Sequence, residues 1–137
     1  MNTTKSTQEW GLLILRLAVG LIFTAHGAQK LLLFGVDGTA GFLGSLGIPL
    51  PQIAAIVLIL VELVGGLALL IGLGTRYVAA LLAVDMAVAL LTVHLANGFF
   101  VDSGGVEFAL VLLAAALFFA LHGGGALAVD RRLTASA

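Results

Sequence analysis

Hydrophobic residues fill four long segments of the chain, and short polar or glycine-rich stretches separate these segments. The four segments are residues 11–34, 53–73, 77–96 and 107–129. A helix needs about 20 mostly apolar residues to cross the hydrocarbon core of a membrane, which is about 30 Å thick, and each segment is that long. The pattern therefore predicts an all-α protein, a bundle of four transmembrane helices in a single domain that takes up residues 1–137.

Polar residues and helix breakers mark the predicted ends of these segments. Residues 1–9 are polar and are expected to fray. The second helix is expected to begin just beyond Pro51, because proline lacks an N–H donor and is tolerated only in the first turn of a helix. The glycine-rich link at residues 35–52 is unusually apolar, which predicts that it lies at the membrane interface with a short helix across residues 39–46. The three glycines at 123–125 are expected to break or end the fourth segment.

Positive charges gather on one side of the predicted membrane. Four crossings place both chain ends on the same side, together with the turn between the second and third segments. That side carries Lys5, Arg76, Arg131 and Arg132, whereas the opposite side carries Lys30, Asp37 and Asp102. Cytoplasmic loops are enriched in lysine and arginine, so the N and C termini are predicted to be cytoplasmic. A cleaved signal peptide is the alternative for the first segment, but its internal Arg16 and the lack of a small-x-small cleavage motif favour an uncleaved helix.

The composition supports a membrane location and excludes several classes of function. Hydrophobic residues make up 61% of the chain and charged residues 9%, whereas soluble domains contain about 25% charged residues. The net charge of −1, with no cluster of lysine and arginine, excludes nucleic-acid binding. The absence of cysteine excludes thiol redox chemistry, c-type haem attachment and iron–sulfur ligation by this chain. The expected partner is the lipid bilayer, and small residues on the helix faces permit a homo-oligomer.

The first segment carries three cationic or titratable residues on one face. On a helix that turns about 100° per residue, Arg16, His26 and Lys30 lie within an arc of about 80°. Each such group costs about 2.5–3.5 kcal/mol at the centre of a membrane when it is unpaired. This face is therefore predicted to look into the bundle, where partners on other helices neutralise it.

Acidic residues on the other segments are the predicted partners. Glu62 and Asp85 lie near mid-depth in the second and third segments. The polar residues expected at the outer level are His26, Lys30, His94, Asn97 and Glu107. Lys30 and Glu107 match in depth, and His26 is placed to bridge toward Glu62. The sequence thus predicts a shared polar pocket in the outer half of the bundle.

Several of these residues also have a purely structural interpretation. Lys30 is long enough to extend its ammonium group to the outer surface, and Arg76 suits an interfacial anchor. Glu107 suits the N-terminus of a helix, where the helix dipole favours a negative charge, and Asp85 can be protonated and hydrogen-bonded. Glu62 is the hardest to explain in this way, because an acid at mid-depth requires a polar neighbour.

Short motifs, in their order along nearly the whole chain, resemble those of the DoxX family of small membrane proteins. They are Arg16-x3-Gly20, His26-Gly27-x2-Lys30, Gly47-Ile48-Pro49-x-Pro51, Glu62-x2-Gly65-Gly66, Gly72-x-Gly74-Thr75-Arg76, His94-x2-Asn97-Gly98-Phe99-Phe100, Glu107, and the glycine-rich stretch before Asp130. The resemblance implies a four-helix protein of the bacterial inner (plasma) membrane. Some members of the family are subunits of thiosulfate:quinone oxidoreductases, and others are linked to oxidative stress and thiol metabolism.

The resemblance also implies which residues matter. The family's motif residues in this chain are Arg16, His26, Lys30, Glu62, Arg76, His94 and Glu107. Asp85 is not among them, and it is predicted as a site residue only from its charge and its depth in the membrane. Phe108 stands where the family often has tyrosine, which removes one hydroxyl donor from any ligand site.

A quinone-linked redox role is the leading functional hypothesis. A quinone is apolar, reaches its site from the bilayer, and takes up two protons on two-electron reduction, so its site needs hydrogen-bond donors and a proton relay. We predict His26, Glu62 and Glu107 as catalytic residues. The predicted ligand-binding residues are Arg16, Lys30, Arg76, Asp85, His94 and Asn97. No metal, haem, iron–sulfur cluster or flavin is expected, so electrons must come from a bound substrate or from a soluble or membrane redox partner.

Two alternatives accompany this hypothesis. In the first, the protein is a non-catalytic carrier, anchor or assembly factor that binds a lipid or small molecule, and the buried charges only fix the packing. In the second, His26 and His94 hold a b-type haem, although lone histidines seldom prove to be ligands. Purified protein distinguishes them, because only the haem protein shows a Soret band.

Overall fold

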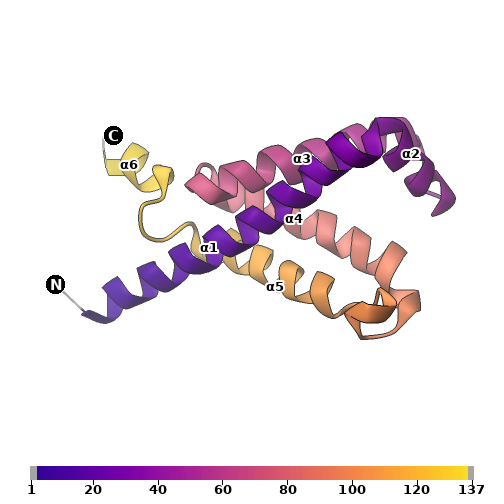
Figure 1. Ribbon diagram of the computed structural model, residues 1–137. Coiled ribbons are helices and arrows are strands. Elements are labelled where there is room, and N and C mark those ends of the chain that lie inside the picture. The colour runs from indigo at the N-terminus through magenta and orange to yellow at the C-terminus, as the bar shows by residue number, and fades with distance from the viewer. Residues whose placement is uncertain (1–2, 136–137) are drawn as a thin grey trace.

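Two helix pairs form two arms that diverge toward the end of the molecule opposite both termini (Figure 1). The computed structural model describes residues 3–135, and these contain helices and no strand. One arm consists of α1 (Thr3–Gln29) packed along α3 (Pro51–Ile71), and the other consists of α4 (Thr75–Ala89) packed along α5 (Glu107–His122). The short helix α6 (Val129–Ala135) lies at the end that carries the termini.

The helices have the length and surface of membrane spans. Within the described residues, three helical segments are long and apolar enough to cross a membrane: Thr4–Ser45, Pro51–Ile71 and Thr75–Asn97. Helix α5 is also apolar, but its 16 residues extend only about 24 Å at 1.5 Å per residue. Leucine, isoleucine and valine cover the outward faces of the helices, as expected where lipid is the solvent. The prediction of an all-α membrane bundle is confirmed.

The predicted boundaries were accurate in the middle of the chain. Pro51 is the first residue of α3, as its missing N–H donor requires. The short helix expected across residues 39–46 is α2 (Gly35–Ser45), which packs against α3. Between α1 and α2 the helix widens into a π-helical turn, η1 (Lys30–Phe34), and a second such turn, η2 (Leu90–His94), follows α4.

The predicted boundaries were wrong at the two ends of the chain. Helix α1 begins at Thr3, although residues 1–9 were expected to fray; residues 1–2 lie outside the described range. Helix α5 ends at His122, short of the predicted extension to residue 129; the break expected at the three glycines is confirmed, because Gly123 adopts a φ of 82°. Beyond it the chain turns back, and the backbone N–H of Ala126 donates to the carbonyl of Glu9 at 3.2 Å. This contact explains why the polar start of α1 is helical.

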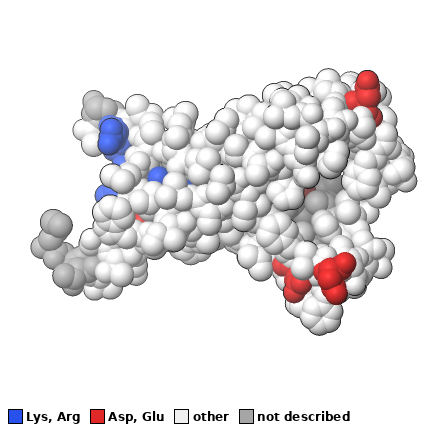
Figure 2. Space-filling model, in the orientation of Figure 1, with Lys and Arg blue, Asp and Glu red and all other residues white. Residues whose placement is uncertain are grey.

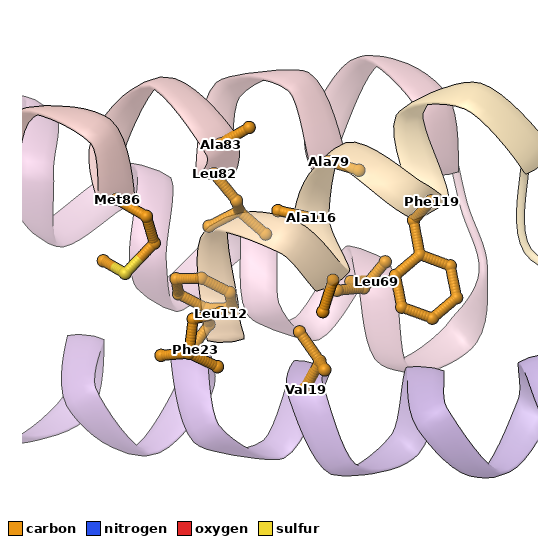
Figure 3. Packing of buried hydrophobic residues seen from close by; sticks show 11 residues of the cluster. Val19, Phe23, Leu69, Ala79, Leu82, Ala83, Met86, Leu112, Ala116 and Phe119 are labelled. Atoms are coloured by element: carbon orange, nitrogen blue, oxygen red, sulfur yellow. The ribbon is translucent and has the colours of Figure 1, made fainter. Parts of the chain in front are cut away.

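Apolar side chains from all four long helices meet in one core where the arms come together (Figure 3). The buried residues of this core are Val19, Phe23, Leu69, Ala79, Leu82, Ala83, Met86, Leu112, Ala115, Ala116 and Phe119. Helix α1 contributes Phe23, which lies beside Leu112 in the close-up view, and Val19, which points toward Leu69 (Figure 3). The core lies between the polar cavity described below and the terminal end of the molecule, so it separates the two polar regions of the protein.

Glycines allow α1 and α3 to cross at very short range. A Cβ atom added to Gly66 would lie 2.4 Å from the backbone nitrogen of Thr24, and one added to Gly27 would lie 2.4 Å from that of Leu63. At this crossing the hydroxyl of Thr24 donates to the carbonyl of Gly20 at 2.7 Å. Small residues at helix crossings let backbones approach closely and pack in the absence of a hydrophobic driving force. The α1–α3 arm is therefore a tightly fixed unit.

The segment after α5 joins the two arms at the terminal end. The Arg16 guanidinium donates to the carbonyls of Gly124 and Ala126. The Asp130 carboxylate accepts from the backbone N–H groups of Gly74 at 2.7 Å and Thr75 at 2.9 Å, and it thereby caps the first turn of α4. An ion pair between Arg131 and Glu9 adds a contact to α1.

Removing the Asp130 cap is expected to weaken the fold. Burial alone would raise the pKa of Asp130, but the N–H groups of Thr75 and Gly74 and the Arg16 charge outweigh burial and hold this pKa below its ordinary value. Because the folded-state pKa is lowered, the stabilisation is present above about pH 4, the ordinary pKa of aspartate, and is lost as the pH falls below it. Asp130→Ala should cost about 1–2 kcal/mol at neutral pH.

The measurement is the free energy of unfolding in detergent at neutral and acid pH. Asp102→Ala is the control, because the Asp102 carboxylate accepts only from Ser103 within its own exposed loop. Equal stability of the wild type and Asp130→Ala at neutral pH would show that the cap does not hold the arms together.

Candidate functional site

A cavity of about 480 Å³ lies between the two arms, on the side away from the termini. Its lining comes from α1, α2, α3, α4 and α5 and from both π-helical turns, and it is mostly apolar. The space-filling view shows the molecule hollowed between the arms (Figure 2). Val57 on α3 and Leu81 and Val84 on α4 line the cavity and are more than half exposed. The cavity is therefore accessible from the lipid beside these two helices.

Six polar residues interrupt this apolar lining. They are His26, Lys30, Glu62, Asp85, Thr92 and His94. Lys30 begins the turn η1 and His94 ends the turn η2. A π-helical turn inserts a residue into the helical repeat and is frequent at functional sites. Five of the nine residues predicted for a site lie on the wall of this cavity.

Lys30 and Glu62 form an ion pair on the cavity wall. The Lys30 Nζ lies 2.6 Å from the Glu62 Oε2, and the side chains are 19% and 4% exposed. The predicted pairing of Lys30 with Glu107 is wrong, because Lys30 pairs with Glu62 while the Glu107 carboxylate accepts from the backbone N–H of Val101. A short, charge-assisted contact of this kind neutralises both groups in a low-dielectric setting.

Asp85 faces this ion pair from the other arm. It interacts electrostatically with both Glu62 and Lys30. Its Oδ2 atom is buried and has no hydrogen-bond partner among the described residues. Buried polar atoms are nearly always paired, so an orphaned one calls for an explanation. The cavity thus contains two acids and one lysine, with one carboxylate oxygen left free.

Two histidines complete the polar part of the cavity. The His94 Nδ1 lies 2.7 Å from the carbonyl of Gly104; since a carbonyl only accepts, this nitrogen carries the proton and Nε2 stays available. His26 is exposed, and its ring centroid lies 6.3 Å from that of Phe108 on α5. No hydrogen bond or ion pair within residues 3–135 joins His26 to Glu62, so the predicted bridge between them is not formed.

Two predicted site residues lie in or beside the loop between η2 and α5 instead of on the cavity wall. Glu107 is the first residue of α5, and its carboxylate accepts from the backbone N–H of Val101 at 2.7 Å. The Asn97 amide donates to the carbonyls of Val93 and Gly104. Neither side chain lines the cavity. Both hold the loop that orients His94, because Gly104 also accepts from this histidine.

Two further predicted residues lie at the terminal end. Arg16 is buried, as its helix face predicted, but it binds backbone carbonyls of the segment after α5. Arg76 is exposed in the first turn of α4, which agrees with the alternative of an interfacial anchor. The core separates both arginines from the cavity.

The sequence analysis missed part of the cavity wall. Phe42 and Leu43 of α2, and Ile48 after it, line the outer part of the cavity. The signal was present in the unusually apolar link, which was predicted to lie at the membrane interface but was not assigned to a site. Thr92 was also missed, and its hydroxyl donates to the carbonyl of Val88 at 2.8 Å. Within residues 3–135, no three histidine, aspartate or glutamate side chains lie close enough to hold a metal ion.

Comparison with known proteins identifies the relatives of this chain. "Putative oxidoreductase CatD" of Bacillus subtilis (strain 168) is 40% identical over 122 residues, which cover 89% of this chain and 86% of that protein. "Inner membrane protein YphA" of Escherichia coli (strain K12) is 34% identical over 126 residues, which cover 88% of this chain and 89% of that protein. No solved structure matches the chain.

These relatives agree with the predicted location, an inner membrane that the chain crosses several times. The sequence model of the DoxX family matches residues 11–95, which include the α1–α3 arm from Gly11 onward and all of α4 and η2. That range contains Lys30, Glu62, Asp85 and His94 of the cavity. The chain is a membrane protein that belongs to the DoxX family.

Proposed function

We propose that this protein binds a quinone in the cavity between its arms and serves as the membrane subunit of an oxidoreductase. The observation that carries the proposal is the Lys30–Glu62 ion pair on the wall of an apolar cavity that is accessible from lipid. Ligand sites of small molecules combine an apolar lining with a few polar groups that fix orientation. The relative named as an oxidoreductase supports the same class of function.

The polar groups of the cavity suit the two oxygens of a quinone head group. The carbonyl oxygens accept hydrogen bonds, and the Lys30 ammonium group, with three N–H donors, has donors beyond the one directed at Glu62. In the Nδ1-protonated tautomer of His94, Nε2 bears no proton, so it can accept a hydrogen bond from a hydroxyl group of the quinol form. Reduction of a quinone to a quinol consumes two electrons and two protons; we assign the electrons to a redox cofactor on a partner protein.

The charges at the two ends of the molecule support a cytoplasmic location for both termini. Lysine and arginine gather at the terminal end and acidic residues at the opposite end (Figure 2). By the positive-inside rule, the terminal end faces the cytoplasm and the cavity lies toward the outer side. Protons for the ligand would then enter from the outer solution, past His94 and the loop that holds it.

Cysteine labelling tests this orientation cleanly, because the chain contains no cysteine. Asp102→Cys in the outer loop should react with a membrane-impermeant maleimide in intact spheroplasts. Thr134→Cys in α6 should react only after the membrane is permeabilised. The opposite pattern would place the cavity on the cytoplasmic side.

Quinone binding itself is measured by titrating the purified wild-type protein with ubiquinone-1. Saturable binding is expected, and in a parallel titration ubiquinol-1 should bind about tenfold more weakly to His94→Ala than to the wild type, a loss of about 1.4 kcal/mol. His122→Ala is the matched control, because this exposed histidine stacks on Phe118 away from the cavity. Absence of saturable binding, or equal affinity for ubiquinol-1 in all three proteins, would contradict the proposal. A tightly copurifying phospholipid that ubiquinone-1 does not displace would favour the carrier alternative.

A further inference from the structure

We infer that Asp85 carries the proton with which the cavity binds a ligand carbonyl oxygen, while Glu62 remains the ionised partner of Lys30. This inference rests on the proposed quinone function and assigns a binding role to a residue outside the family's motif residues. It assigns different roles to Glu62 and Asp85, two acids that the sequence alone does not distinguish, since both lie near the middle of a membrane span.

The first argument is the charge balance of the cavity wall. Glu62 is held at 2.6 Å by Lys30, and its side chain is only 4% exposed, so these two charges cancel. Asp85 has no cation of its own, and its Oδ2 has no hydrogen-bond partner in the described part of the chain. A lone carboxylate in a membrane interior is costly, and such a group becomes neutral by binding a proton. One proton therefore belongs to this cluster, and Asp85 is the acid free to hold it.

The second argument is the placement of Asp85 itself on the cavity wall. Asp85 lines the cavity from α4, opposite the arm that carries the ion pair. A protonated carboxyl group there donates a hydrogen bond to a carbonyl oxygen, whereas Glu62 has its donor already in Lys30. The ligand class that fits is a lipid-soluble compound with a carbonyl oxygen at its polar end, as in the oxidised form of a quinone.

The surroundings of Asp85 offer few other groups that titrate. Glu62 faces it from α3 and Lys30 from η1. His26 of α1 and His94 of η2 line the same cavity, and the α5 residues of the wall, Phe108, Ala109 and Leu112, do not titrate. The pH dependence of ligand binding can therefore be assigned to Asp85 by substituting it and leaving the other groups of the wall unchanged.

The test is the affinity for ubiquinone-1 from about pH 5 to pH 9 in the wild type, Asp85→Asn and the control Asp102→Asn. In the wild type, affinity should fall by about tenfold per pH unit once Asp85 ionises. Asp85→Asn donates through its amide at every pH, so its affinity should not vary with pH. Asp102→Asn should follow the wild type, because Asp102 lies in the exposed loop outside the cavity. A wild-type pH profile in Asp85→Asn would overturn the inference and leave quinone binding intact.

Infrared spectroscopy of the wild type gives a second readout that needs no variant to fold. The C=O stretch of a protonated carboxyl group should disappear over the same pH range in which affinity falls. A band that persists while affinity falls, or no such band at any pH, would overturn the assignment to Asp85. Absence of saturable binding at every pH would instead remove the proposed function and this inference together.

Discussion

Replacing Gly66 by alanine should destabilise the protein by about 3 kcal/mol, the upper end of the range for overpacked cores. The added Cβ would lie 2.4 Å from the backbone nitrogen of Thr24 and 2.6 Å from its hydroxyl oxygen. Backbone atoms cannot move aside without separating α1 from α3. The separation would also loosen Lys30 from Glu62, since Glu62 lies on α3 and Lys30 directly follows α1. Denaturation by SDS in mixed micelles measures the free energy of unfolding.

The neighbouring glycine is the matched control for this prediction. A Cβ added to Gly65 would meet its nearest atoms, on Leu82 and Val78, at 3.5 Å, an ordinary van der Waals contact. Gly65→Ala should therefore be neutral or slightly stabilising, because alanine favours the helix over glycine by about 1 kcal/mol. Equal effects of the two substitutions would mean that the α1–α3 crossing is looser than the structure shows.

Replacing Lys30 by methionine should cost about 3 kcal/mol at neutral pH, the lower end of the range for breaking a buried ion pair. Methionine keeps the length of the side chain but leaves two acids, Glu62 and Asp85, facing each other without a cation. The stranded acids can take up protons, so the loss should be smaller in acid than in alkali. Unfolding in SDS at two pH values measures both effects.

Two further variants test whether the loss of stability in Lys30→Met comes from the broken ion pair. Lys5→Met removes an exposed lysine at the terminal end and should change stability by less than about 0.5 kcal/mol. The double variant Lys30→Met/Glu62→Leu removes both charges of the pair and should recover much of the lost stability. A Lys30→Met variant as stable as the wild type at all pH values would show that the pair is not desolvated.

Sequence reasoning predicted the parts of the structure that follow from the cost of exposing charge to lipid. Apolar segments of sufficient length gave the helices, and the arc shared by Arg16 and Lys30 placed that face of α1 inside the bundle. The same cost placed Glu62 and Asp85 in the interior, where they line the cavity. These inferences needed only helical geometry and the membrane as solvent.

The pairing of the charges could not be predicted, because it depends on how the helices pack. The predicted depth in the membrane favoured Glu107 as the partner of Lys30. In the structure α1 packs along α3, and this packing brings Glu62 to Lys30 instead. Arg16 binds the carbonyl of Gly124, which is 108 residues away in the sequence, and no local pattern indicates such a contact. The early start of α1 likewise depends on the returning segment after α5, which contacts Glu9.

Photo-crosslinking with an azidoquinone, followed by peptide mapping, tests most directly whether the cavity between the arms is the ligand site. The account predicts labelling of the α3 and α4 residues that line the cavity, such as Val57 and Val84, and suppression of this labelling by excess ubiquinone-1. Labelling confined to lipid-facing residues outside the cavity, such as Ile14 of α1, and unaffected by ubiquinone-1 would contradict it.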